Sequence, residues 1–481
     1  MPVFDAALDA KLSLVHVRHE AAAVHMADAW GRLTGQPGIA LVTGGPGHAN
    51  AVGALYTALA AESPMVLLSG HAPLDELGKG AFQEMRQADV AAPLCKASWT
   101  ARSADTLGED LARAWRTAIS GRPGPVHLSL PNDVLDAATD ARPPSRFDKD
   151  PLPPDAVSLK EIAQSISSAT RPVILCGPAM MNAPGRERMA RLEEAAGAPV
   201  IGMESPRGVK DPSLGRLAKV LGEADVVVLL GKRRDFTLGF GKPFAQARVI
   251  EAPDGIDIAA SMDVLLAGRF SRKGNSWADD VRKALAFRPA EWTAAKSKKE
   301  GPIHPVELCR AVQKLLDAPD AVLVCDGGEF GQWSQACLTA PHRVINGPAG
   351  SIGSALPFAA AAKLARPGAN VVAMLGDGTL GFHLSEFDTA VRCRLGYVAV
   401  VGNDACWNAE HQIQLRAYGA GRAHGLDLLP TRYGAVAAAM GAHGEDVSRP
   451  GELPDALARA ASSGRVACVN AAIERLPAPA Y

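Results

Sequence analysis

Acidic and amide side chains follow two apolar runs in the last third of the chain. Val371–Leu375 leads into Gly-Asp-Gly, which carries Asp377, and Tyr397–Val401 leads into the pair Asn403 and Asp404. Apolar runs of this length are typical of buried strands. Carboxylate and amide oxygens are hard ligands of the kind that magnesium prefers. These residue types at these positions therefore predict a magnesium site.

A helix is expected between the two strands, because Leu384–Val391 spaces its apolar residues helically. Parallel strands joined by a crossover helix have both carboxyl ends at one edge of the sheet, which is where open α/β sheets bind ligands. A tight turn at Gly-Asp-Gly and a helix cap at Asn-Asp would also explain these residues, since both are ordinary turn chemistry.

Composition narrows the class of protein. The chain has 481 residues, a net charge of −1 and 47% hydrophobic residues. That length suits about three domains of roughly 100 to 200 residues each, and the charge gives no general attraction to nucleic acid or anionic membranes. No apolar run approaches the roughly 18 residues of a membrane helix, and the start of the chain lacks the order of a signal peptide. We therefore expect a cytoplasmic enzyme with a small-molecule substrate and neither a nucleic-acid nor a membrane partner.

The eight cysteines are scattered without CxxC or metal-like spacing, so we expect reduced core thiols.

Strands and helices alternate in three blocks, which predicts an α/β protein with three doubly wound parallel-sheet domains. The domains are expected at residues 1–139, 158–286 and 304–481, separated by a proline-rich and a lysine-rich linker. The expected strands are Leu14–Val17, Ile39–Val42, Met65–Leu68 and Val126–Leu130 in the first block, those within RPVILCG, APVIGM, ADVVVLLG and ARVIEA in the second, and those within AVLVCDGG, NVVAMLGDG, YVAVVGND and VACVNAAI in the third.

Gly-Asp-Gly and Asn-Asp are separated by 24 residues, 379–402. This arrangement resembles the cofactor fingerprint of thiamine diphosphate enzymes. The resemblance implies thiamine diphosphate with Mg²⁺, the metal being held by the side chains of Asp377 and Asp404 and by the backbone carbonyl of Cys406. The family has Asn where this chain has Asp404, so the site gains a negative charge beside the diphosphate.

Two further segments of the third block are similar to the same family. DGGEFGQW resembles the loop that contacts the diphosphate, and GSIG, with Ile352, resembles the turn whose apolar side chain keeps the cofactor bent. The residues that the resemblance assigns to cofactor binding are Gly328, Glu329, Phe330, Ile352, Gly376, Gly378, Thr379, Asn403 and Trp407.

Glu20 follows an apolar stretch and begins an amphipathic helix in "RHEAAAVHMADAWGRL". A first-turn acid stabilised by the helix dipole and paired with Arg18 would account for it structurally. The stretch also resembles the pyrimidine-binding domain of thiamine diphosphate enzymes. By that resemblance Glu20 binds the cofactor's pyrimidine ring and promotes removal of the thiazolium proton.

The catalytic candidates on the substrate side are His48 in GPGHAN, His71 in SGHAP, and Gln83 in GAFQEM with its neighbours Phe82 and Glu84. Acetolactate synthases and 2-hydroxyacyl-CoA lyases place a similar Phe-Gln-Glu over the thiazolium. Surface or cap residues in strand-end loops are the structural alternative for each. Trp407, Asn408, Glu410 and Gln412 are further candidates after the metal motif.

The middle block resembles the family's central domain, which binds FAD in acetolactate synthases, ADP in some CoA-using relatives and no nucleotide in others. LGKRRDFTLGFG is similar to its nucleotide-side loop, but LCGPAMMN contains no GxGxxG. FAD or ADP binding therefore stays open.

The chain as a whole resembles the acetolactate synthase, benzaldehyde lyase and 2-hydroxyacyl-CoA lyase group. The implied function is a thiamine diphosphate-dependent C–C lyase or carboligase acting on a 2-oxo acid or 2-hydroxyacyl substrate. A homodimer or homotetramer is implied too, with the pyrimidine domain of one subunit facing the diphosphate domain of another.

Two alternatives stand beside this function. Relatives usually carry a further segment before PVFDAALDA, so a catalytically impaired, cofactor-binding paralogue or partner subunit is the first. An NAD-dependent oxidoreductase is the second, but it predicts a GxGxxG with an acid about 20 residues later, which the sequence lacks.

Overall fold

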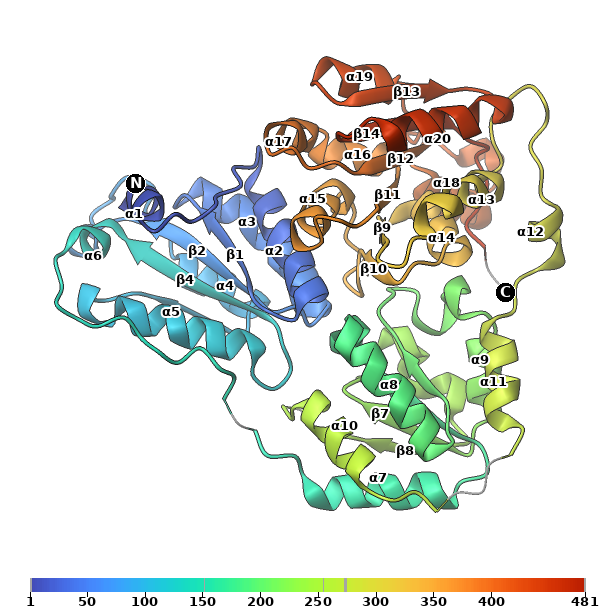
Figure 1. Cartoon of the computed structure of the whole chain (residues 1–481), viewed down its shortest axis with the longest axis horizontal. Coiled ribbons are helices and arrows are strands. Elements are labelled where there is room, and N and C mark those ends of the chain that lie inside the picture. The colour runs from blue at the N-terminus through green and yellow to red at the C-terminus, as the bar shows by residue number, and fades with distance from the viewer. Residues whose placement is uncertain (1, 151, 254, 272–274, 480–481) are drawn as a thin grey trace. The chain divides into compact units, whose positions relative to one another are not determined.

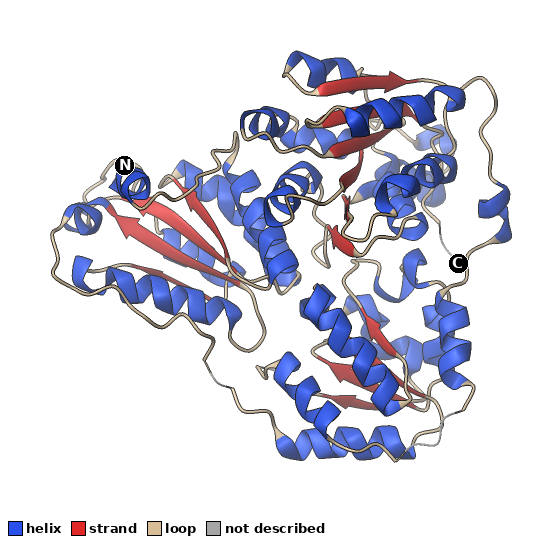
Figure 2. Ribbon diagram, in the orientation of Figure 1, coloured by secondary structure: helices blue, strands red, loops and turns tan. Residues whose placement is uncertain are grey.

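The computed structural model describes residues 2–150, 152–253, 255–271 and 275–479. Two compact units emerge, one reaching from the start to Pro154 with 255–258, the other containing the remaining described residues. Each unit is built from parallel strands with helices on the sheet faces (Figures 1 and 2). None of the helices in the described part of the chain has the length and apolar character needed to cross a membrane.

The first unit contains a four-stranded parallel sheet in the order β1-β2-β4-β3. Its strands are β1 (Gly38–Val42), β2 (Met65–His71), β3 (Ala97–Thr100) and β4 (Pro125–Pro131). Its helices are α1 (Pro2–Asp9), α2 (Glu20–Thr34), α3 (Pro46–Ala60), α4 (Gln87–Ala91), α5 (Ala104–Ile119) and α6 (Asn132–Asp136).

The second unit begins with a smaller parallel sheet in the order β6-β5-β7-β8. Its strands are β5 (Pro172–Cys176), β6 (Val200–Gly202), β7 (Val226–Leu230) and β8 (Arg248–Glu251). The helices of this part are α7 (Ala156–Ser168), α8 (Ala183–Ala196), α9 (Leu217–Glu223), α10 (Ile258–Ala267), α11 (Trp277–Leu285) and α12 (Ala290–Ala294).

The same unit ends in a six-stranded parallel sheet in the order β10-β9-β11-β12-β14-β13. Its strands are β9 (Val322–Cys325), β10 (His342–Ile345), β11 (Val371–Gly376), β12 (Val398–Asn403), β13 (His443–Val447) and β14 (Ala467–Ala472). Its helices are α13 (Pro305–Leu316), α14 (Gly328–Cys337), α15 (Ala355–Ala365), α16 (Asp377–His383), α17 (Glu386–Arg392), α18 (Asn408–Tyr418), α19 (Tyr433–Ala439) and α20 (Leu453–Ser462).

The predicted α/β class with three parallel sheets is confirmed. Each sheet lies inside one of the three predicted residue ranges, although the second and third ranges pack into one compact unit. The predicted strand Leu14–Val17 is wrong, because these residues form no backbone ladder and Leu14 is half exposed. An apolar run becomes a strand only where a neighbour can pair with it.

Three strands were not predicted, namely β3, β10 and β13, and each is an edge strand of its sheet. Their residues are largely half-buried, so they lack the continuous apolar run of a central strand. The helix expected over Leu384–Val391 is present as α17, whereas α16, which begins directly at Asp377, was not predicted.

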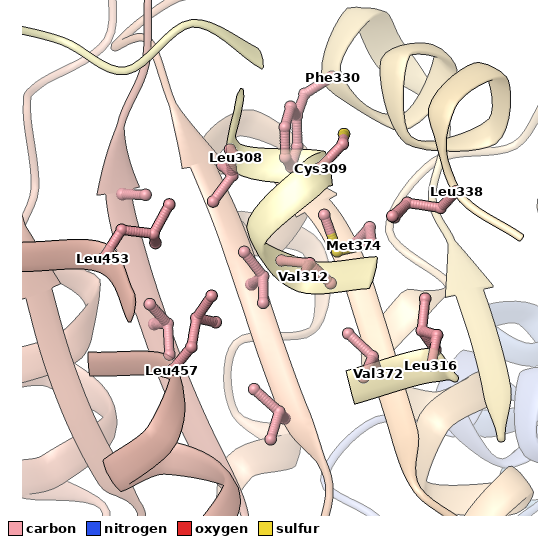
Figure 3. Packing of buried hydrophobic residues seen from close by; sticks show 14 of the residues in the cluster. Leu308, Cys309, Val312, Leu316, Phe330, Leu338, Val372, Met374, Leu453 and Leu457 are labelled. Atoms are coloured by element: carbon pink, nitrogen blue, oxygen red, sulfur yellow. The ribbon is translucent and has the colours of Figure 1, made fainter. Parts of the chain in front are cut away.

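The core of the six-stranded sheet is formed by apolar side chains from three helices and the central strands (Figure 3). Leu308 and Val312 of α13 and Leu457 of α20 pack against it, together with Val372 and Met374 of β11. Full burial of one such side chain contributes about 1.5 to 3 kcal/mol. This core makes the edge formed by the carboxyl ends of β9, β11 and β12 a rigid support.

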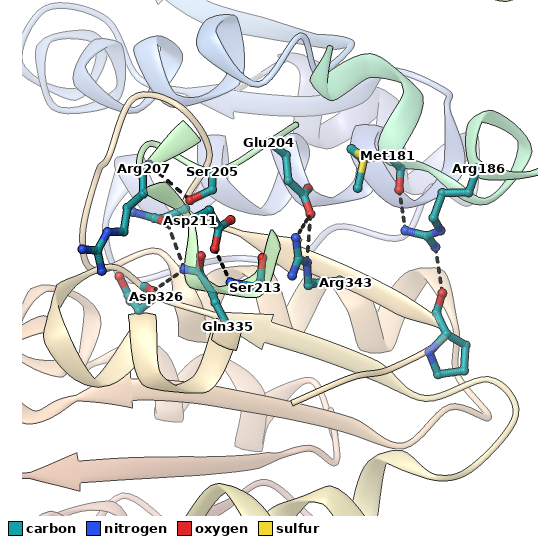
Figure 4. Close-up of polar contacts among 12 residues, drawn as sticks. Met181, Arg186, Glu204, Ser205, Arg207, Asp211, Ser213, Asp326, Gln335 and Arg343 are labelled. Carbon is teal, nitrogen blue, oxygen red and sulfur yellow. Dashed lines mark hydrogen bonds and ion pairs between the residues drawn. The ribbon is translucent and has the colours of Figure 1, made fainter. Parts of the chain in front are cut away.

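Ion pairs and hydrogen bonds join the two sheets of the second unit (Figure 4). Glu204, just after β6, pairs with Arg343 of β10 at 2.7 Å, and both are largely buried. Arg186 of α8 donates to the carbonyl oxygens of Met181 at 2.6 Å and Pro341 at 2.7 Å. Because a buried charge is costly without its partner, these contacts fix the loop after β6 relative to the larger sheet.

Two helical glycines of the first unit provide a matched test of its packing. A Cβ at Gly31 would lie 2.3 Å from the carbonyl oxygen of Pro64, whereas a Cβ at Gly53 would meet no atom within 4 Å. We predict that Gly31→Ala lowers the free energy of unfolding by about 1 to 3 kcal/mol through overpacking. Gly53→Ala should raise it by about 0.5 to 1 kcal/mol through helix propensity. Urea unfolding of both variants checks this, and equal effects would contradict the packing of α2.

Candidate functional site

A cavity of about 350 Å³ opens at the carboxyl ends of β9, β11 and β12. β10 and β11 lie on opposite sides of β9, so the strand order reverses at this point, as it does at ligand sites of open α/β sheets. The lining residues are Ser205–Arg207, Gly327–Phe330, Gln332, Gln335, Asn346, Gly350, Ile352, Gly376–Thr379, Gly402, Asp404, Cys406 and Trp407–Glu410.

Nearly all the cofactor residues expected in the last block meet in this cavity. Gly328, Glu329 and Phe330 come from the start of α14, and Gly376, Gly378 and Thr379 surround the start of α16. Ile352 and Trp407 complete the set.

Asn403 is not among the residues that line the cavity. Its carboxamide nitrogen donates to Thr431 O at 2.9 Å and to Asn470 Oδ1 at 3.1 Å, and its oxygen accepts from Ala405 N at 3.1 Å. Asn403 therefore fixes the end of β12 in the structure rather than facing a ligand.

Asp326 organises one wall of the cavity. Its Oδ1 accepts from the backbone N–H groups of Gly327 and Gly353, both at 2.8 Å, and its Oδ2 accepts from Ala355 N at 3.0 Å. Burial raises the pKa of this carboxyl to about 6, and the N–H donors oppose that rise. One side chain thus holds both the glycine loop and the turn that carries Ile352.

Close contacts leave room only for glycine in that wall. A Cβ at Gly327 would lie 2.7 Å from Cγ2 of Ile352, and a Cβ at Gly378 would lie 2.8 Å from the Trp407 ring. The side chains of Ile352 and Trp407 therefore pack directly on the backbone of the two loops.

Asp377 is the first residue of α16 and is 2% exposed. Its Oδ2 atom is buried and has no hydrogen-bond partner among the described residues. Burial raises the pKa of this carboxyl to about 6, while backbone N–H groups, Gly378 first among them, lower it. A buried carboxylate oxygen without a partner is costly and suits a cation.

Asp404 adds a second acid to the same cavity. Burial, and next the charge of Asp377, raise its pKa to about 7. The backbone beside it is fixed by Ala405 O, which accepts from Leu428 N, and by Trp407 N, which donates to Leu426 O, both at 2.8 Å. Neither bond uses the backbone carbonyl of Cys406, which the family resemblance implies as the third metal ligand.

The charge balance of the cavity is strongly negative. One arginine, Arg207, lines the cavity, whereas four acidic residues line it: Glu329, Asp377, Asp404 and Glu410. No cluster of three metal-binding side chains occurs within the described ranges, so a metal here would need ligands beyond Asp377 and Asp404. The Cys406 carbonyl and a bound diphosphate would provide them, and in that respect the residues present fit the implied cofactor and metal.

Two contributors to the cavity were missed by sequence reasoning. Asp326 begins the DGGEFGQW segment but was assigned no role of its own, and Arg207 lies in the loop after β6, far from the motif in sequence. Arg207 donates to Gln332 of α14 and to Pro479 O at 3.3 Å, and burial lowers its pKa. Its backbone N–H donates to Ser205 Oγ at 3.2 Å (Figure 4). The one sequence feature that could have indicated a role for Arg207 is its place in Ser-Pro-Arg-Gly, shortly after a predicted strand.

Glu20, His48, His71 and Gln83 belong to the first unit and are described within it. Glu20 is the first residue of α2, as expected, and its Oε2 accepts from Asn50 Nδ2 at 3.1 Å. A Cβ at Gly47 would lie 3.2 Å from Oε1 of Glu20. The carboxylate therefore lies beside the Gly-Pro-Gly turn at the start of α3.

The two histidines are interior residues rather than loop residues. His48 is fully buried in α3, with Nδ1 2.9 Å from Ser69 Oγ, and burial lowers its pKa to about 4. Ser69 also contacts His127 Nε2 at 3.2 Å, which continues the chain of polar contacts across the sheet. His71 ends β2, and its ring nitrogens lie 2.9 Å from Ala72 O and 3.2 Å from Met85 O.

The basic loop of the middle block is held by its own carboxylates. Lys232 pairs with Asp235 at 2.8 Å, and Arg234 pairs with Glu251 at the end of β8. These ion pairs offset part of the basic charge of the loop.

Comparison with known protein families matches both ends of the chain. Residues 1–90 match the N-terminal TPP binding domain of thiamine pyrophosphate enzymes, and residues 326–471 match the C-terminal TPP binding domain. Acetolactate synthase large subunit IlvG of Mycobacterium tuberculosis is 33% identical over 508 aligned residues, covering 100% of this chain and 92% of the relative. The chain belongs to the thiamine pyrophosphate enzyme family.

Another group of relatives in this family carries a different activity in its name. The 2-hydroxyacyl-CoA lyase 2 of Homo sapiens is 31% identical, covering 92% of this chain and 80% of the relative. That of Caenorhabditis elegans is 30% identical over 98% of this chain and 85% of the relative. Thiamine diphosphate, the same compound as thiamine pyrophosphate, is therefore the cofactor expected in the cavity.

The raised pKa values of the two cavity acids predict a pH effect in metal-free protein. An acid whose folded pKa exceeds its unfolded value binds more protons when folded, so its contribution to stability falls as pH rises from about 4 to 7. Asp404→Asn removes this loss. We predict that the variant gains on the order of 1 to 3 kcal/mol relative to wild type between pH 4 and 7.

Urea unfolding in the presence of a chelator measures this difference. Asp455→Asn, which removes an exposed acid of α20 outside the cavity, is the matched control. If the difference in free energy of unfolding between Asp404→Asn and wild type does not change with pH, the crowding of Asp377 and Asp404 is contradicted.

Proposed function

We propose that this protein is a thiamine diphosphate-dependent C–C lyase or carboligase acting on a 2-oxo acid or a 2-hydroxyacyl substrate. The observation that carries the proposal is the buried, unpartnered Oδ2 of Asp377 in a cavity shared with Asp404. That cavity lies in a chain similar along its whole length to acetolactate synthase.

Asp377, Asp404 and the Cys406 carbonyl would hold Mg²⁺, and the N–H groups at the start of α14 and α16 would bind the diphosphate. Ile352 and Trp407 would limit where the rest of the cofactor lies. Bound thiamine diphosphate supplies a nucleophilic carbon that attacks a carbonyl and accepts the electron pair of the cleaved C–C bond. Arg207, the cation of the cavity, would offset part of its negative charge.

Residues of the first unit would handle protons and orient the substrate. Glu20 would hold a proton at the cofactor's pyrimidine ring, and Asn50 fixes its carboxylate for that task. The Gln83 carboxamide would orient the reacting carbonyl. His48, kept neutral by burial, and His71 would support this face through Ser69 and the Met85 carbonyl.

Two substrate classes follow from the names of the relatives. The name acetolactate synthase implies 2-oxo acids, with decarboxylation and transfer to a second carbonyl. The name 2-hydroxyacyl-CoA lyase implies cleavage of a C–C bond in the acyl group of a 2-hydroxyacyl-CoA thioester. In both classes a carbonyl carbon lies next to the C–C bond that is broken, so both would suit the chemistry that the cofactor would supply.

The test is a product profile. Protein loaded with thiamine diphosphate and Mg²⁺ is incubated with a panel of 2-oxo acids and 2-hydroxyacyl-CoA thioesters, and products are identified by mass. We predict turnover of at least one class, and a Glu20→Gln variant that binds the cofactor normally but is slower by roughly 10² to 10⁴-fold.

Two results would contradict this function. Wild-type protein that binds the cofactor but turns over neither class would favour a partner subunit without its own activity. Turnover by Glu20→Gln equal to wild type would remove Glu20 from proton transfer.

We also propose that the active form is at least a homodimer in which the two halves of a site come from different subunits. The similarity to acetolactate synthase supports this arrangement, and the two compact units separate Glu20 from Asp377 along the chain. Most soluble homo-oligomers have closed symmetry of this kind.

Mixing two inactive variants tests the shared site. We predict that Glu20→Gln and Asp377→Ala subunits, unfolded together and reassembled at equal concentration, regain about a quarter of the wild-type sites, because half the random dimers pair both variants and each has one intact site. Full activity in a sedimenting monomer, or no recovery in confirmed mixed dimers, would exclude the arrangement.

A further inference from the structure

The loop between β2 and α4, Leu77–Arg86, places Gln83 in an unusual backbone conformation. Gln83 has φ of +58°, in the left-handed region that residues with a side chain rarely adopt. Phe82 beside it is 86% exposed, so no apolar burial fixes this part of the loop. Other contacts must hold Gln83 in place.

The first of these contacts is a close approach to the Gly-Pro-Gly turn. A Cβ at Gly45 would lie 2.9 Å from both Cβ and the carbonyl oxygen of Gln83, so the loop backbone packs on this glycine. Gly45 is itself held, because its N–H donates to Gln87 Oε1 at 2.8 Å. The Gln87 nitrogen donates to Gly70 O at 3.0 Å and to Ser129 Oγ at 3.1 Å. The backbone beneath Gln83 is therefore tied to two strands of the sheet, β2 through Gly70 and β4 through Ser129.

The second contact is made by Glu84, the residue that follows Gln83. Its Oε1 accepts from Gly78 N at 2.6 Å, and its Oε2 accepts from Gly80 N at 3.2 Å and from Ala81 N at 3.1 Å. The backbone N–H of Glu84 donates to Ala81 O at 3.0 Å, which closes the turn. The Gly78 N–H, the largest influence, lowers the pKa of this carboxyl, so it stays ionised at neutral pH.

A carboxylate that accepts three backbone N–H groups has little capacity left for a substrate. Glu84 was a substrate-side candidate from its motif, but these bonds direct it into its own loop. Without them, the strained φ of Gln83 would relax, because no buried side chain of the loop tip opposes relaxation.

We propose that Glu84 is a positioning residue, whose carboxylate closes the turn 78–84 and thereby fixes the place from which Gln83 reaches the substrate. This rests on the proposed function, in which the Gln83 carboxamide orients the reacting carbonyl. Displacement of such a group by about 1 Å is enough to cost up to roughly 10²-fold in rate.

A double-mutant cycle in holoprotein tests it, with pyruvate and a 2-hydroxyacyl-CoA as the probes. Glu84→Gln, which turns one acceptor oxygen into a donor facing N–H groups, should lower kcat about tenfold and leave the Kd of thiamine diphosphate unchanged. In a Gln83→Ala background the same change should cost less than twofold, since Glu84 acts through Gln83. A tenfold loss in both backgrounds would overturn the proposal.

Proteolysis supplies a readout that needs no turnover. Lys79 and Arg86 flank Gln83, so trypsin cleavage after either residue reports opening of the loop. We expect Glu84→Gln to be cleaved about tenfold faster than wild type. Glu76→Gln is the control, because its exposed side chain accepts no hydrogen bond in the described part of the chain.

Kinetics and cleavage together separate the role of Gln83 in catalysis from the role of Glu84 in holding the loop. If Gln83→Ala turns over its substrate like wild type, the role of Gln83 in the proposed function fails, and cleavage rates alone decide whether Glu84 holds the loop. Equal cleavage of Glu84→Gln and wild type would overturn the positioning role whatever the kinetics show.

Discussion

The burial of two neighbouring carboxyl groups, Asp377 and Asp404, is the constraint on which the rest of the site depends. Burial raises the pKa of both carboxyl groups, and the charge of Asp377 raises the pKa of Asp404 further. Arg207 is the cavity's own cation, and it is already hydrogen-bonded to Gln332. A divalent cation would relieve this cost, because it would give the unpartnered oxygen of Asp377 a partner and offset the charge of both acids. The electrostatics of the cavity therefore agree with the matches to TPP binding domains.

The fold supplies the geometry that this electrostatic arrangement needs. The reversal of strand order at β9 brings the carboxyl ends of β9, β11 and β12 to one cavity, and the core beneath them is continuous and apolar. Asp326 uses three backbone hydrogen bonds to couple two loops of that cavity. The smaller sheet contributes Arg207 through a loop anchored by the Glu204–Arg343 ion pair. In the first unit, buried polar contacts play the corresponding part around Gln87 and Ser69.

The sequence predicted those features that depend on local pattern. Central strands are continuous apolar runs, and the spacing of Gly-Asp-Gly and Asn-Asp led directly to Asp377 and Asp404. Edge strands β3, β10 and β13 escaped prediction because half-exposed strands carry mixed residues, and Leu14–Val17 failed because an apolar run cannot show whether a pairing neighbour exists. Arg207 and the inward turn of Asn403 depend on contacts between residues distant in sequence. Glu84 was a substrate-side candidate from its motif, but only the structure shows that its carboxylate binds N–H groups of its own loop.

Calorimetry of thiamine diphosphate binding, with and without Mg²⁺, tests the central claim most directly. If the paired acids of the cavity require a cation to accept the diphosphate, wild-type protein binds the cofactor tightly only when Mg²⁺ is present. Asp377→Ala should weaken that binding by roughly 100-fold, as loss of groups at a metal site typically does. Equal affinity with and without Mg²⁺, or an Asp377→Ala protein that binds the cofactor like wild type, would contradict the account.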